Sequence, residues 1–591
     1  MAAAATDANH SAVANPAAAS SRVDVGRLDS SWAWSVLIIC ILAFLILYPI
    51  ATLGLGALTF GDPVVNGFAG LSLSFDNFHA VFSNPNVGEA LLNSLMTCGL
   101  GTLVAVALGL TFSWIVVRTD TPCSGLIAGA GMLPLFVPPL VAGVAWSILG
   151  SPRSGLINLV LASSGLPWRV NLYSMWGVVF VFGIYYAPYV YMFAAPALTN
   201  MDPSLEEAAE VTGSSPLRTA LTVTLPLIAP AIMAGMLLSF VVMLGIYGIP
   251  AALGTPANLP VLTTYIYKLT SWTPPLYNLA AAVAVVLLAI AAALVAVQQR
   301  LLSGRSFTTV SGKAFHPRRL RLGAWRWVTL SIALAYVVVA IVLPLFALLI
   351  AAFRRFLFIP KLGSLFDVKA YSLLHFERLF ANPLMQRSVW NTLEVGCITA
   401  VIGGALAFAV AYAVHRTKMP ARRTIDLIAT LPVAIPGLVI GVAYLWAWIG
   451  LPGGLYGTIW ILALAFVARF VPDTVKSLTT SLLQIHRDLE EASWVCGRGR
   501  LATIARIVVP LARPGLIASM TLLFVLAIRE LGSSLFLYTN KTMIMAVLLL
   551  DYYESGNMGV TAAFSILQIL LLTALIGGAQ LLARSLRAPT A

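Results

Sequence analysis

Leu205-Glu-Glu-Ala-Ala-Glu-Val-Thr-Gly213 is an acidic stretch between two long apolar segments, and it returns later in the chain as Leu489-Glu-Glu-Ala-Ser-Trp-Val-Cys-Gly497. The likeness continues beyond each glycine, because ten residues later the chain reads Val223-Thr-Leu-Pro226 and Ile507-Val-Val-Pro510. Solubility alone does not impose a fixed spacing over so long a stretch. The sequence therefore predicts that one structural unit occurs twice in this polypeptide.

The composition places both units in a lipid bilayer. Of the 591 residues, 60% are hydrophobic and 10% are charged, and the mean hydropathy is +0.92. A helix needs roughly 20 mostly apolar residues to span a bilayer. The windows that meet this requirement are 34–60, 90–117, 124–150, 174–197, 225–251, 276–298, 325–353, 389–414, 424–450, 458–482, 509–537 and 559–583. We therefore expect an all-α polytopic membrane protein with about twelve transmembrane helices.

The two halves are expected to be parallel repeats. Each half contains an even number of predicted spans, so both acidic stretches face the same side of the membrane, unlike the inverted repeats of many secondary transporters. A shift of 298 residues aligns Phe78 and Asn93 with Phe376 and Asn391, and the shift falls to 284 by the acidic stretches. The first half therefore has an insertion, near 151–173, and Leu156-Ile-Asn-Leu-Val-Leu-Ala is predicted to be a short external helix there.

Four regions follow from this organisation. We expect a disordered cytoplasmic tail over 1–31, a first transmembrane domain over 32–300, a basic cytoplasmic linker over 301–324 and a second transmembrane domain over 325–591. The net charge of +13 is attributed to basic residues on cytoplasmic loops rather than to nucleic-acid binding, because the basic residues form no motif interleaved with aromatics.

The acidic stretches resemble a known family motif. Glu207-Ala-Ala-x3-Gly213-x9-Val223-x-Leu225-Pro226 is similar to the EAA motif of permease subunits of binding-protein-dependent ABC importers, and the second copy departs mainly at Ser493 and Val509. The resemblance implies the type I importer permease fold and a short cytoplasmic helix that docks in a groove on an ATPase subunit. Residues expected to carry this coupling role are Glu206, Glu207, Ala208, Gly213, Glu490, Glu491, Ala492 and Gly497. The alternative is a charged loop helix with no partner.

The resemblance also implies partners and a location. The chain has no GxxxxGK[ST] motif, since Ser311-Gly312-Lys313 lacks the preceding glycine, so we expect no cofactor bound by this chain and no ATP hydrolysis. Two separate ABC ATPase subunits on the cytoplasmic face are expected to use ATP and Mg, and a periplasmic binding protein is expected to deliver the solute. The location is then the bacterial inner membrane. The scattered cysteines and histidines predict no metal site.

Prolines and charges within the spans are candidates for the translocation path. Pro134, Pro138, Pro432 and Pro436 remove backbone donors at membrane depth, and either shape the path or are packing kinks. Asp473, Arg529 and Glu530 are charged groups inside predicted spans, which usually face a bundle interior or a wet cavity. Because Arg469 and Asp473 are one helical turn apart, we expect them to neutralise each other as an internal brace.

Four tyrosines in the fourth predicted span allow two readings. Phenolates of Tyr185, Tyr186, Tyr189 and Tyr191 can bind a hard cation such as ferric iron, but aromatic belts at the membrane interface are far commoner. We therefore expect an interfacial belt.

The solute is inferred from a finer resemblance. Phe524-Val-Leu-Ala-Ile-Arg-Glu-Leu-Gly-Ser-Ser-Leu-Phe-Leu-Tyr538 and Asp551-Tyr-Tyr-Glu-Ser-Gly556 resemble fused ferric-iron importer permeases. Ferric iron is the first expectation, and aminoethylphosphonate, thiamine and polyamine importers of the same architecture are alternatives. From another class, a secondary transporter driven by an ion gradient would need neither ATPase nor acidic stretches. An intramembrane enzyme would need convergent His, Asp or Cys groups, which the sequence does not offer.

Overall fold

The fold is helical and duplicated. The computed structural model describes residues 30–60, 72–302, 319–449 and 454–585. Residues 1–29 of the predicted tail, most of the predicted linker and residues 450–453 lie outside these ranges. Within the described residues a single two-stranded antiparallel ribbon, β1–β2, accompanies the helices.

The elements of the first half run from α1 to α14. They are α1 (Ser30–Leu42), η1 (Ala43–Leu47), α2 (Tyr48–Ala57), β1 (Thr59–Phe60), β2 (Ser72–Leu73), α4 (Asp76–Ser83), α5 (Pro85–Arg118), α6 (Ser124–Met132), η3 (Leu133–Phe136), α7 (Pro139–Gly150), α8 (Leu156–Ser163), α9 (Met175–Thr199), α10 (Ser204–Val211), α11 (Pro216–Thr219), η4 (Ala220–Thr224), α12 (Leu225–Leu244), η5 (Pro250–Gly254), η6 (Thr255–Ala257), α13 (Leu262–Ser271) and α14 (Tyr277–Leu302).

The second half repeats this order. Its elements are η7 (Gly323–Trp325), α15 (Arg326–Val337), η8 (Val338–Val342), α16 (Leu343–Phe353), η9 (Leu362–Phe366), η10 (Val368–Ala370), α17 (Leu374–Ala381), α18 (Pro383–Arg416), α19 (Arg422–Thr430), η11 (Leu431–Ala434), α20 (Gly437–Ile449), α21 (Ile459–Leu483), α22 (Asp488–Val495), α23 (Arg500–Thr503), η12 (Ile504–Val508), α24 (Val509–Ile528), η13 (Ser534–Phe536), α25 (Met545–Glu554) and α26 (Met558–Ser585).

The helix bounds confirm both registers read from the sequence. Helices α5 and α18 have bounds that differ by 298 residues at each end, and those of α9 and α21 differ by 284. The predicted external helix in the insertion is α8. Two predicted spans, 225–251 and 509–537, are too long, because α12 ends at Leu244 and α24 at Ile528. The chain then turns into the space between the halves.

The number of membrane-crossing helices agrees with the prediction of about twelve. Among the described residues, nine helices are long and apolar enough to cross a membrane. Two helix pairs, α6–η3 with α7 and α19–η11 with α20, are bent by 98° and 112° and bring the number to eleven if each pair is one span. Helix α21 has 25 residues but carries Arg469, Asp473 and Lys476, which lower its hydropathy. Spans three and nine are therefore broken rather than merely kinked.

Prolines cause these breaks. The chain after η3 reads Val137-Pro138-Pro139, and after η11 it reads Ile435-Pro436. A proline donates no backbone hydrogen bond and its ring clashes with the preceding turn, so it bends or breaks a helix. The missing donors sit at the same place in both halves, and the two breaks face each other across the centre of the molecule.

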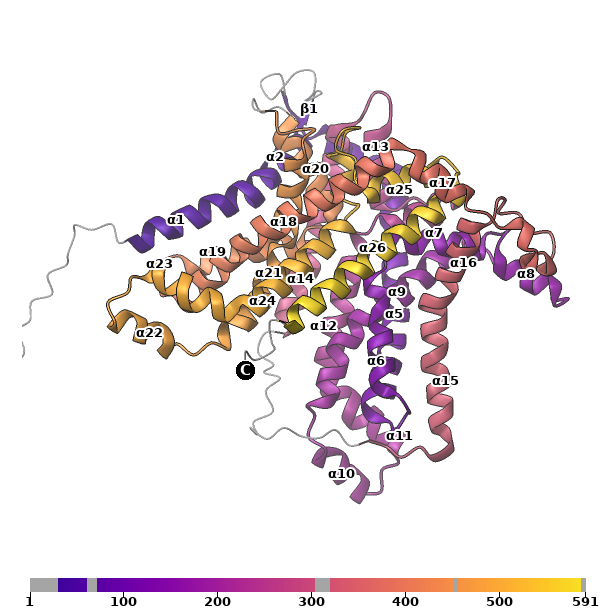
Figure 1. Ribbon diagram of the computed structural model, residues 1–591, viewed down its shortest axis with the longest axis horizontal. Coiled ribbons are helices and arrows are strands. Elements are labelled where there is room, and N and C mark those ends of the chain that lie inside the picture. Colours follow the sequence, from indigo (N-terminus) through magenta and orange to yellow (C-terminus); the bar gives the residue numbers. More distant parts are fainter. Residues whose placement is uncertain (1–29, 61–71, 303–318, 450–453, 586–591) are drawn as a thin grey trace, which may run out of the picture.

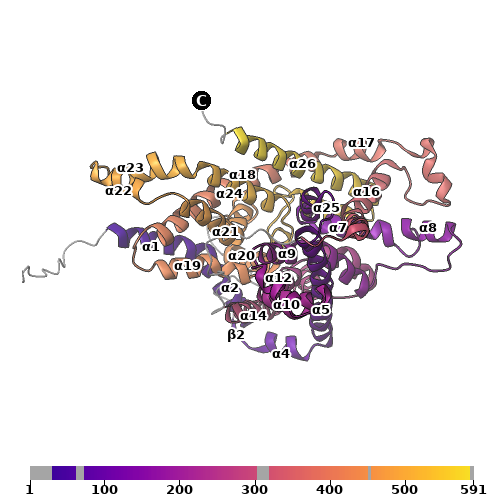
Figure 2. The ribbon, with the colours of Figure 1, turned by 90° about the horizontal axis from the view of Figure 1, so that it is seen from below.

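The halves exchange their first helices. Helices α1 and α2 pack on α19 and α20 of the second half, whereas α15 and α16 pack on α5, α6 and α7 of the first. Tyr48 Oη donates to the Ala447 carbonyl at 2.9 Å, and Tyr336 Oη donates to the Ile184 carbonyl at 3.0 Å. Each first helix therefore fastens one half to the other. Figures 1 and 2 show the acidic helices α10 and α22 well apart, and Figure 1 shows each at one end of its half.

Candidate functional sites: two acidic helices and a central cavity

Each acidic stretch forms a short helix that ends at a glycine. Gly213 and Gly497 have φ values of +86° and +79°, which L side chains rarely adopt. The amide of Gly213 donates to the Glu210 carbonyl at 2.8 Å, and the amide of Ser214 donates to the Ala209 carbonyl at 3.0 Å. The same two bonds recur after α22. This pattern is a Schellman C-cap, so glycine is required at both positions for a structural reason.

Buried ion pairs hold both acidic helices to their own halves. Glu206 pairs with Arg118 at the end of α5, with 3.1 Å between Oε2 and Nη1, and its Oε1 accepts a hydrogen bond from Thr224 at 2.6 Å. Arg118 is only 1% exposed. In the second half Glu490 pairs with Arg416 at 3.6 Å and accepts a hydrogen bond from Tyr412 at 2.8 Å.

These contacts change the role expected for two residues. Glu206 and Glu490 are among the residues expected to carry the coupling role, and both are buried and face their own half. A carboxylate in a buried, hydrogen-bonded pair is not available to a docking partner. We therefore assign them to positioning the helices. The equivalent arginines were missed as site residues, although their recurrence in the repeat, at Arg118-Thr119 and Arg416-Thr417, was a usable signal.

The outward faces of the acidic helices hold the remaining predicted residues. Glu207, Ala208, Gly213, Glu491, Ala492 and Gly497 are all exposed. Apolar side chains accompany them at equivalent positions of the two halves. These exposed pairs are Leu205 and Leu489, Val211 and Val495, and Leu217 and Leu501. A matched set of exposed apolar residues around an acidic helix is typical of a protein docking surface.

The departure of the second copy from the motif has a structural reason. Ser493 Oγ lies 2.9 Å from Thr503 Oγ1, and both side chains are buried. In the first half the equivalent residues are Ala209 and Thr219, and Thr219 Oγ1 is buried without a hydrogen-bond partner. Serine in place of alanine thus supplies a bond that the first half lacks.

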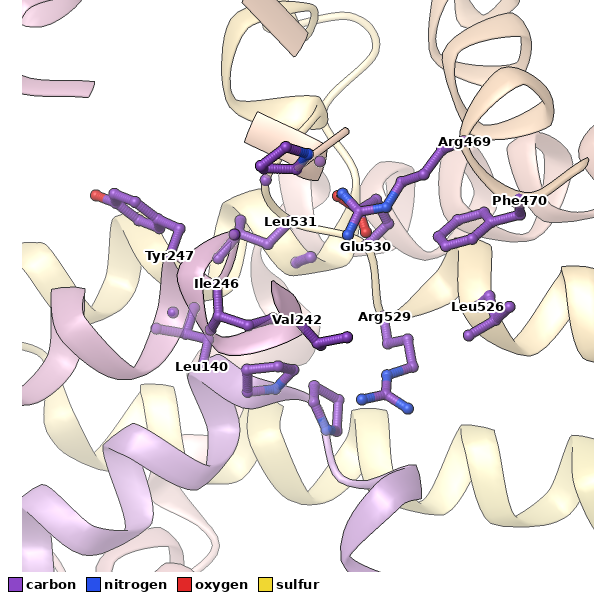
Figure 3. Close-up of a pocket in the computed structure, with 18 of the residues that line it drawn as sticks. Leu140, Val242, Ile246, Tyr247, Arg469, Phe470, Leu526, Arg529, Glu530 and Leu531 are labelled. Carbon is purple, nitrogen blue, oxygen red and sulfur yellow. The ribbon is translucent and has the colours of Figure 1, made fainter. Parts of the chain in front are cut away.

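A cavity lies between the halves at the two broken spans. It has a volume of about 220 Å³, and its first-half wall is apolar apart from three tyrosines, Tyr186, Tyr189 and Tyr247. Six of the seven predicted path residues line it, namely Pro138, Pro432, Pro436, Asp473, Arg529 and Glu530; Pro134 is buried in η3 and does not line it. All four charged lining residues belong to the second half, so the cavity is polar on one side (Figure 3).

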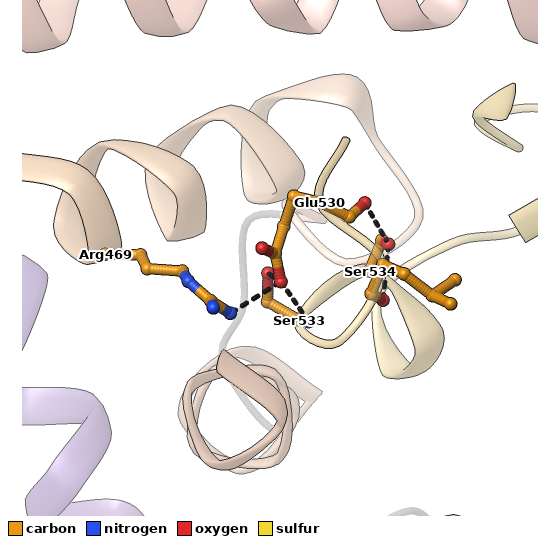
Figure 4. A network of polar contacts seen from close by, with 5 residues as sticks. Arg469, Glu530, Ser533 and Ser534 are labelled. Carbon is orange, nitrogen blue, oxygen red and sulfur yellow. Dashed lines mark hydrogen bonds and ion pairs between the residues drawn. The ribbon is translucent and has the colours of Figure 1, made fainter. Parts of the chain in front are cut away.

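Arg469 pairs with Glu530 rather than with Asp473. Arg469 Nη1 lies 2.6 Å from Glu530 Oε1, and the same oxygen accepts hydrogen bonds from the amide and the hydroxyl of Ser533, both at 3.0 Å (Figure 4). The predicted brace within α21 is therefore wrong. Because α24 ends at Ile528, Glu530 lies in a turn whose donors fix its carboxylate, and the arginine joins this preorganised group.

A glycine makes room for this pair. A Cβ placed on Gly437 would overlap the Arg469 guanidinium, so a larger residue at the start of α20 would displace the end of this side chain. The equivalent first-half position is Pro139, which faces no arginine because Tyr185 replaces Arg469 there. The Arg469–Glu530 pair and the glycine that makes room for it are therefore both features of the second half that the first half lacks.

Arg529 fastens the second half to the break of the first. Its Nη1 donates to the carbonyl of Leu135 in η3. That carbonyl would normally be bonded by an amide three or four residues later, but those positions are Pro138 and Pro139, which have none. Figure 3 shows Arg529 pointing away from the Arg469–Glu530 pair. The prolines therefore create an acceptor that a residue of the other half satisfies.

The tyrosines do not form the expected belt. Tyr185 and Tyr186 are 4% and 5% exposed near the middle of α9, and Tyr186 and Tyr189 stack with ring centroids 5.7 Å apart on the cavity wall. Tyr191 packs against Phe112. The interfacial belt is thus wrong for this cluster, since it faces inward within the helix rather than towards a membrane boundary.

The run from Asp551 to Gly556 contacts the first half of the chain. Tyr553 in α25 donates to the Ala252 carbonyl of the first half at 2.6 Å. Burial raises the pKa of Tyr267 to about 12, and the nearby carboxylate of Glu554 contributes to this rise. Burial also raises the pKa of Glu554, and Asp551 adds to it. Phenols and carboxylates of both halves therefore crowd together here, although no three His, Cys, Asp or Glu side chains converge anywhere in the described residues.

Comparisons with known proteins agree with the duplication. The family model described as "binding-protein-dependent transport system inner membrane component" matches twice, over residues 101–308 and 400–588. The ferric transport system permease protein of Actinobacillus pleuropneumoniae is 27% identical over 492 residues, which cover 83% of this chain and 70% of that protein. A putative ferric transport system permease protein of Haemophilus influenzae is 25% identical over 88% of this chain and 79% of its own length.

A solved structure is also similar over one part of the chain. A bacterial ABC transporter involved in the import of the acidic polysaccharide alginate is 24% identical, with 46% of this chain and 96% of that chain covered and a TM-score of 0.37.

Proposed function

Because the chain belongs to the binding-protein-dependent transport system inner membrane component family, as a permease fused from two such domains, we propose that it forms the path of an ATP-driven import system. The observation that carries the proposal is the pair of acidic helices, each braced by a buried arginine and each exposing the same surface. A helix fixed to its own half by an ion pair can transmit a push from a docked subunit to α5 or α18. The central cavity between the halves is then the part of the path that such movement opens and closes.

The partners follow from the same surfaces. Two ABC ATPase subunits on the cytoplasmic face would dock on α10 and α22 and hydrolyse ATP with Mg, and this chain would bind no cofactor itself. A periplasmic binding protein would deliver the solute on the opposite side, which places the chain in a bacterial inner membrane. Relatives of this chain are named as permease proteins of transport systems, in line with a membrane component that catalyses no reaction.

A photo-crosslinking amino acid at Ala208 and at Ala492 tests the docking. In cells that express the complete importer, we expect both positions to crosslink to the ATPase subunit. The same probe at Ser163, exposed at the end of α8, is the control and should give no such product. Absence of an ATPase crosslink at both positions in a transporting complex would contradict the docking.

The solute that we propose is ferric iron. Two relatives that cover most of this chain are named as ferric transport permeases, although at only 25–27% identity. The test is uptake of radioactive ferric iron by cells that depend on this importer, with competition by aminoethylphosphonate, thiamine and polyamine. Iron uptake that requires the chain supports the proposal. Uptake of an organic solute without iron would assign one of the alternatives.

A further inference from the structure

Tyr189 and Asp473 occupy equivalent positions in the two halves. The bounds of α9 and α21 differ by 284 residues at both ends, and the same shift aligns Tyr189 with Asp473. Both residues line the central cavity, one on each wall. The pseudo-twofold relation of the halves therefore presents a phenol and a carboxylate to the same space.

The other charged groups of the cavity are already engaged. The carboxylate of Glu530 is held by Arg469 and Ser533, and Arg529 donates to the Leu135 carbonyl. In the described part of the chain, Asp473 takes part in no hydrogen bond or salt bridge, and it is exposed to the cavity. Asp473 is thus the one lining carboxylate whose oxygens are free to meet a solute.

We propose that Asp473 and Tyr189 form a transient contact for a hard multivalent cation on its way through the cavity, with Tyr186 stacked beside Tyr189. This inference rests on the proposed function and names the residues that select its cargo. Carboxylate and phenolate oxygens are hard ligands that suit such ions. When the phenol binds, its O–H bond breaks, a metal–oxygen bond forms and the proton passes to water.

The surrounding charges make this contact weak. Arg469 and Arg529 balance Asp473 and Glu530, so the lining carries no net charge, and a trivalent cation gains little from the cavity as a whole. A site on a transport path must bind well enough to admit an ion and weakly enough to release it. The positive charge of Arg529 is therefore expected to lower the affinity, while Asp473 raises it.

The experiment uses Tb³⁺ as a hard trivalent probe of the full-length chain in lipid nanodiscs. Tb³⁺ emission excited through a nearby tyrosine reports binding. We expect Asp473→Asn to weaken the affinity by about 10-fold or more, Tyr189→Phe to reduce the emission at saturation, and Arg529→Gln to strengthen binding. Matched controls are Glu394→Gln, an exposed carboxylate of α18, and Tyr191→Phe, which lies outside the cavity; neither should change binding.

The outcomes separate this inference from the proposed function. Unchanged Tb³⁺ binding in Asp473→Asn, or equal losses in Glu394→Gln, would overturn the inference. If substitution in this cavity abolished Tb³⁺ binding merely by misfolding the protein, Arg529→Gln would lose binding as well. Stronger binding in Arg529→Gln supports the site. If the wild-type chain binds Tb³⁺ through Asp473 but cells import no ferric iron, the proposed solute fails and the cation contact stands. If cells import iron equally well with Asp473→Asn, the cation contact fails alone.

Discussion

The two halves are alike at the acidic helices and unlike at the cavity. At α10 and α22 the helix bounds, the C-cap glycines and the buried ion pairs all recur. At the cavity, Tyr185, Tyr189, Gly245 and Ile246 of the first half are replaced by Arg469, Asp473, Arg529 and Glu530. Symmetry is therefore kept where two ATPase subunits are proposed to dock, and it is lost where one solute is proposed to pass.

The largest expected effect tests the symmetric region. Arg118→Met and Arg416→Met each leave a buried glutamate without its partner, which costs about 3–5 kcal/mol when both groups are fully buried. We expect either variant to lower the thermal unfolding temperature of the purified protein strongly and to a similar degree. Adding Glu206→Gln to Arg118→Met should restore part of the loss, and Arg218→Met, at an exposed arginine, should have little effect. A large loss in one half only would break the proposed equivalence.

A second test addresses the asymmetric region. Gly437→Ala displaces the Arg469 guanidinium from its position against α20 and therefore weakens the Arg469–Glu530 pair. We expect a lower unfolding temperature and slower solute uptake. Gly125→Ala in α6, where an added Cβ would meet nothing within 4 Å, is the control. Wild-type uptake by Gly437→Ala would show that the Arg469–Glu530 pair does not shape the path.

The smallest expected effect comes from placing the residue of one acidic helix at the equivalent position of the other, where the two copies of the motif differ. Ser493→Ala removes the bond to Thr503 and should cost about 1 kcal/mol. The reverse change, Ala209→Ser, offers a partner to the unsatisfied Thr219 and should be neutral or stabilising by a similar amount. Thermal unfolding of the two variants measures both signs. Destabilisation by Ala209→Ser as large as that by Ser493→Ala would contradict this explanation of the departure.

Local patterns predicted much of this structure. Hydropathy and the repeat placed most of the spans, both registers and the insertion helix α8, because these depend on residues close in sequence. The prolines and most of the charged residues of the cavity lining were also identified, since both are conspicuous in apolar spans, whereas most of its apolar residues were not. The angles of the broken spans were not predictable, because they depend on packing between the halves.

The partners of charged residues were less predictable. Spacing within α21 favoured an Arg469–Asp473 brace, but a residue 61 positions away competed for the arginine. Likewise, the sequence could not show that Glu206 and Glu490 turn inward while Glu207 and Glu491 face outward, since all four are acidic residues of one motif. Tertiary structure decides both cases.

The central claim is that α10 and α22 couple ATP hydrolysis to the path. Its most direct test is ATP-driven solute uptake by the complete importer in proteoliposomes, with valine at both Gly213 and Gly497. The positive φ of these residues makes valine strained there. We predict that uptake falls to background in this double variant, while Gly165→Val, at a positive-φ glycine after α8, retains it. If the double variant is correctly inserted in the membrane and its uptake is unchanged, ATP coupling is contradicted and a transporter driven by an ion gradient is favoured.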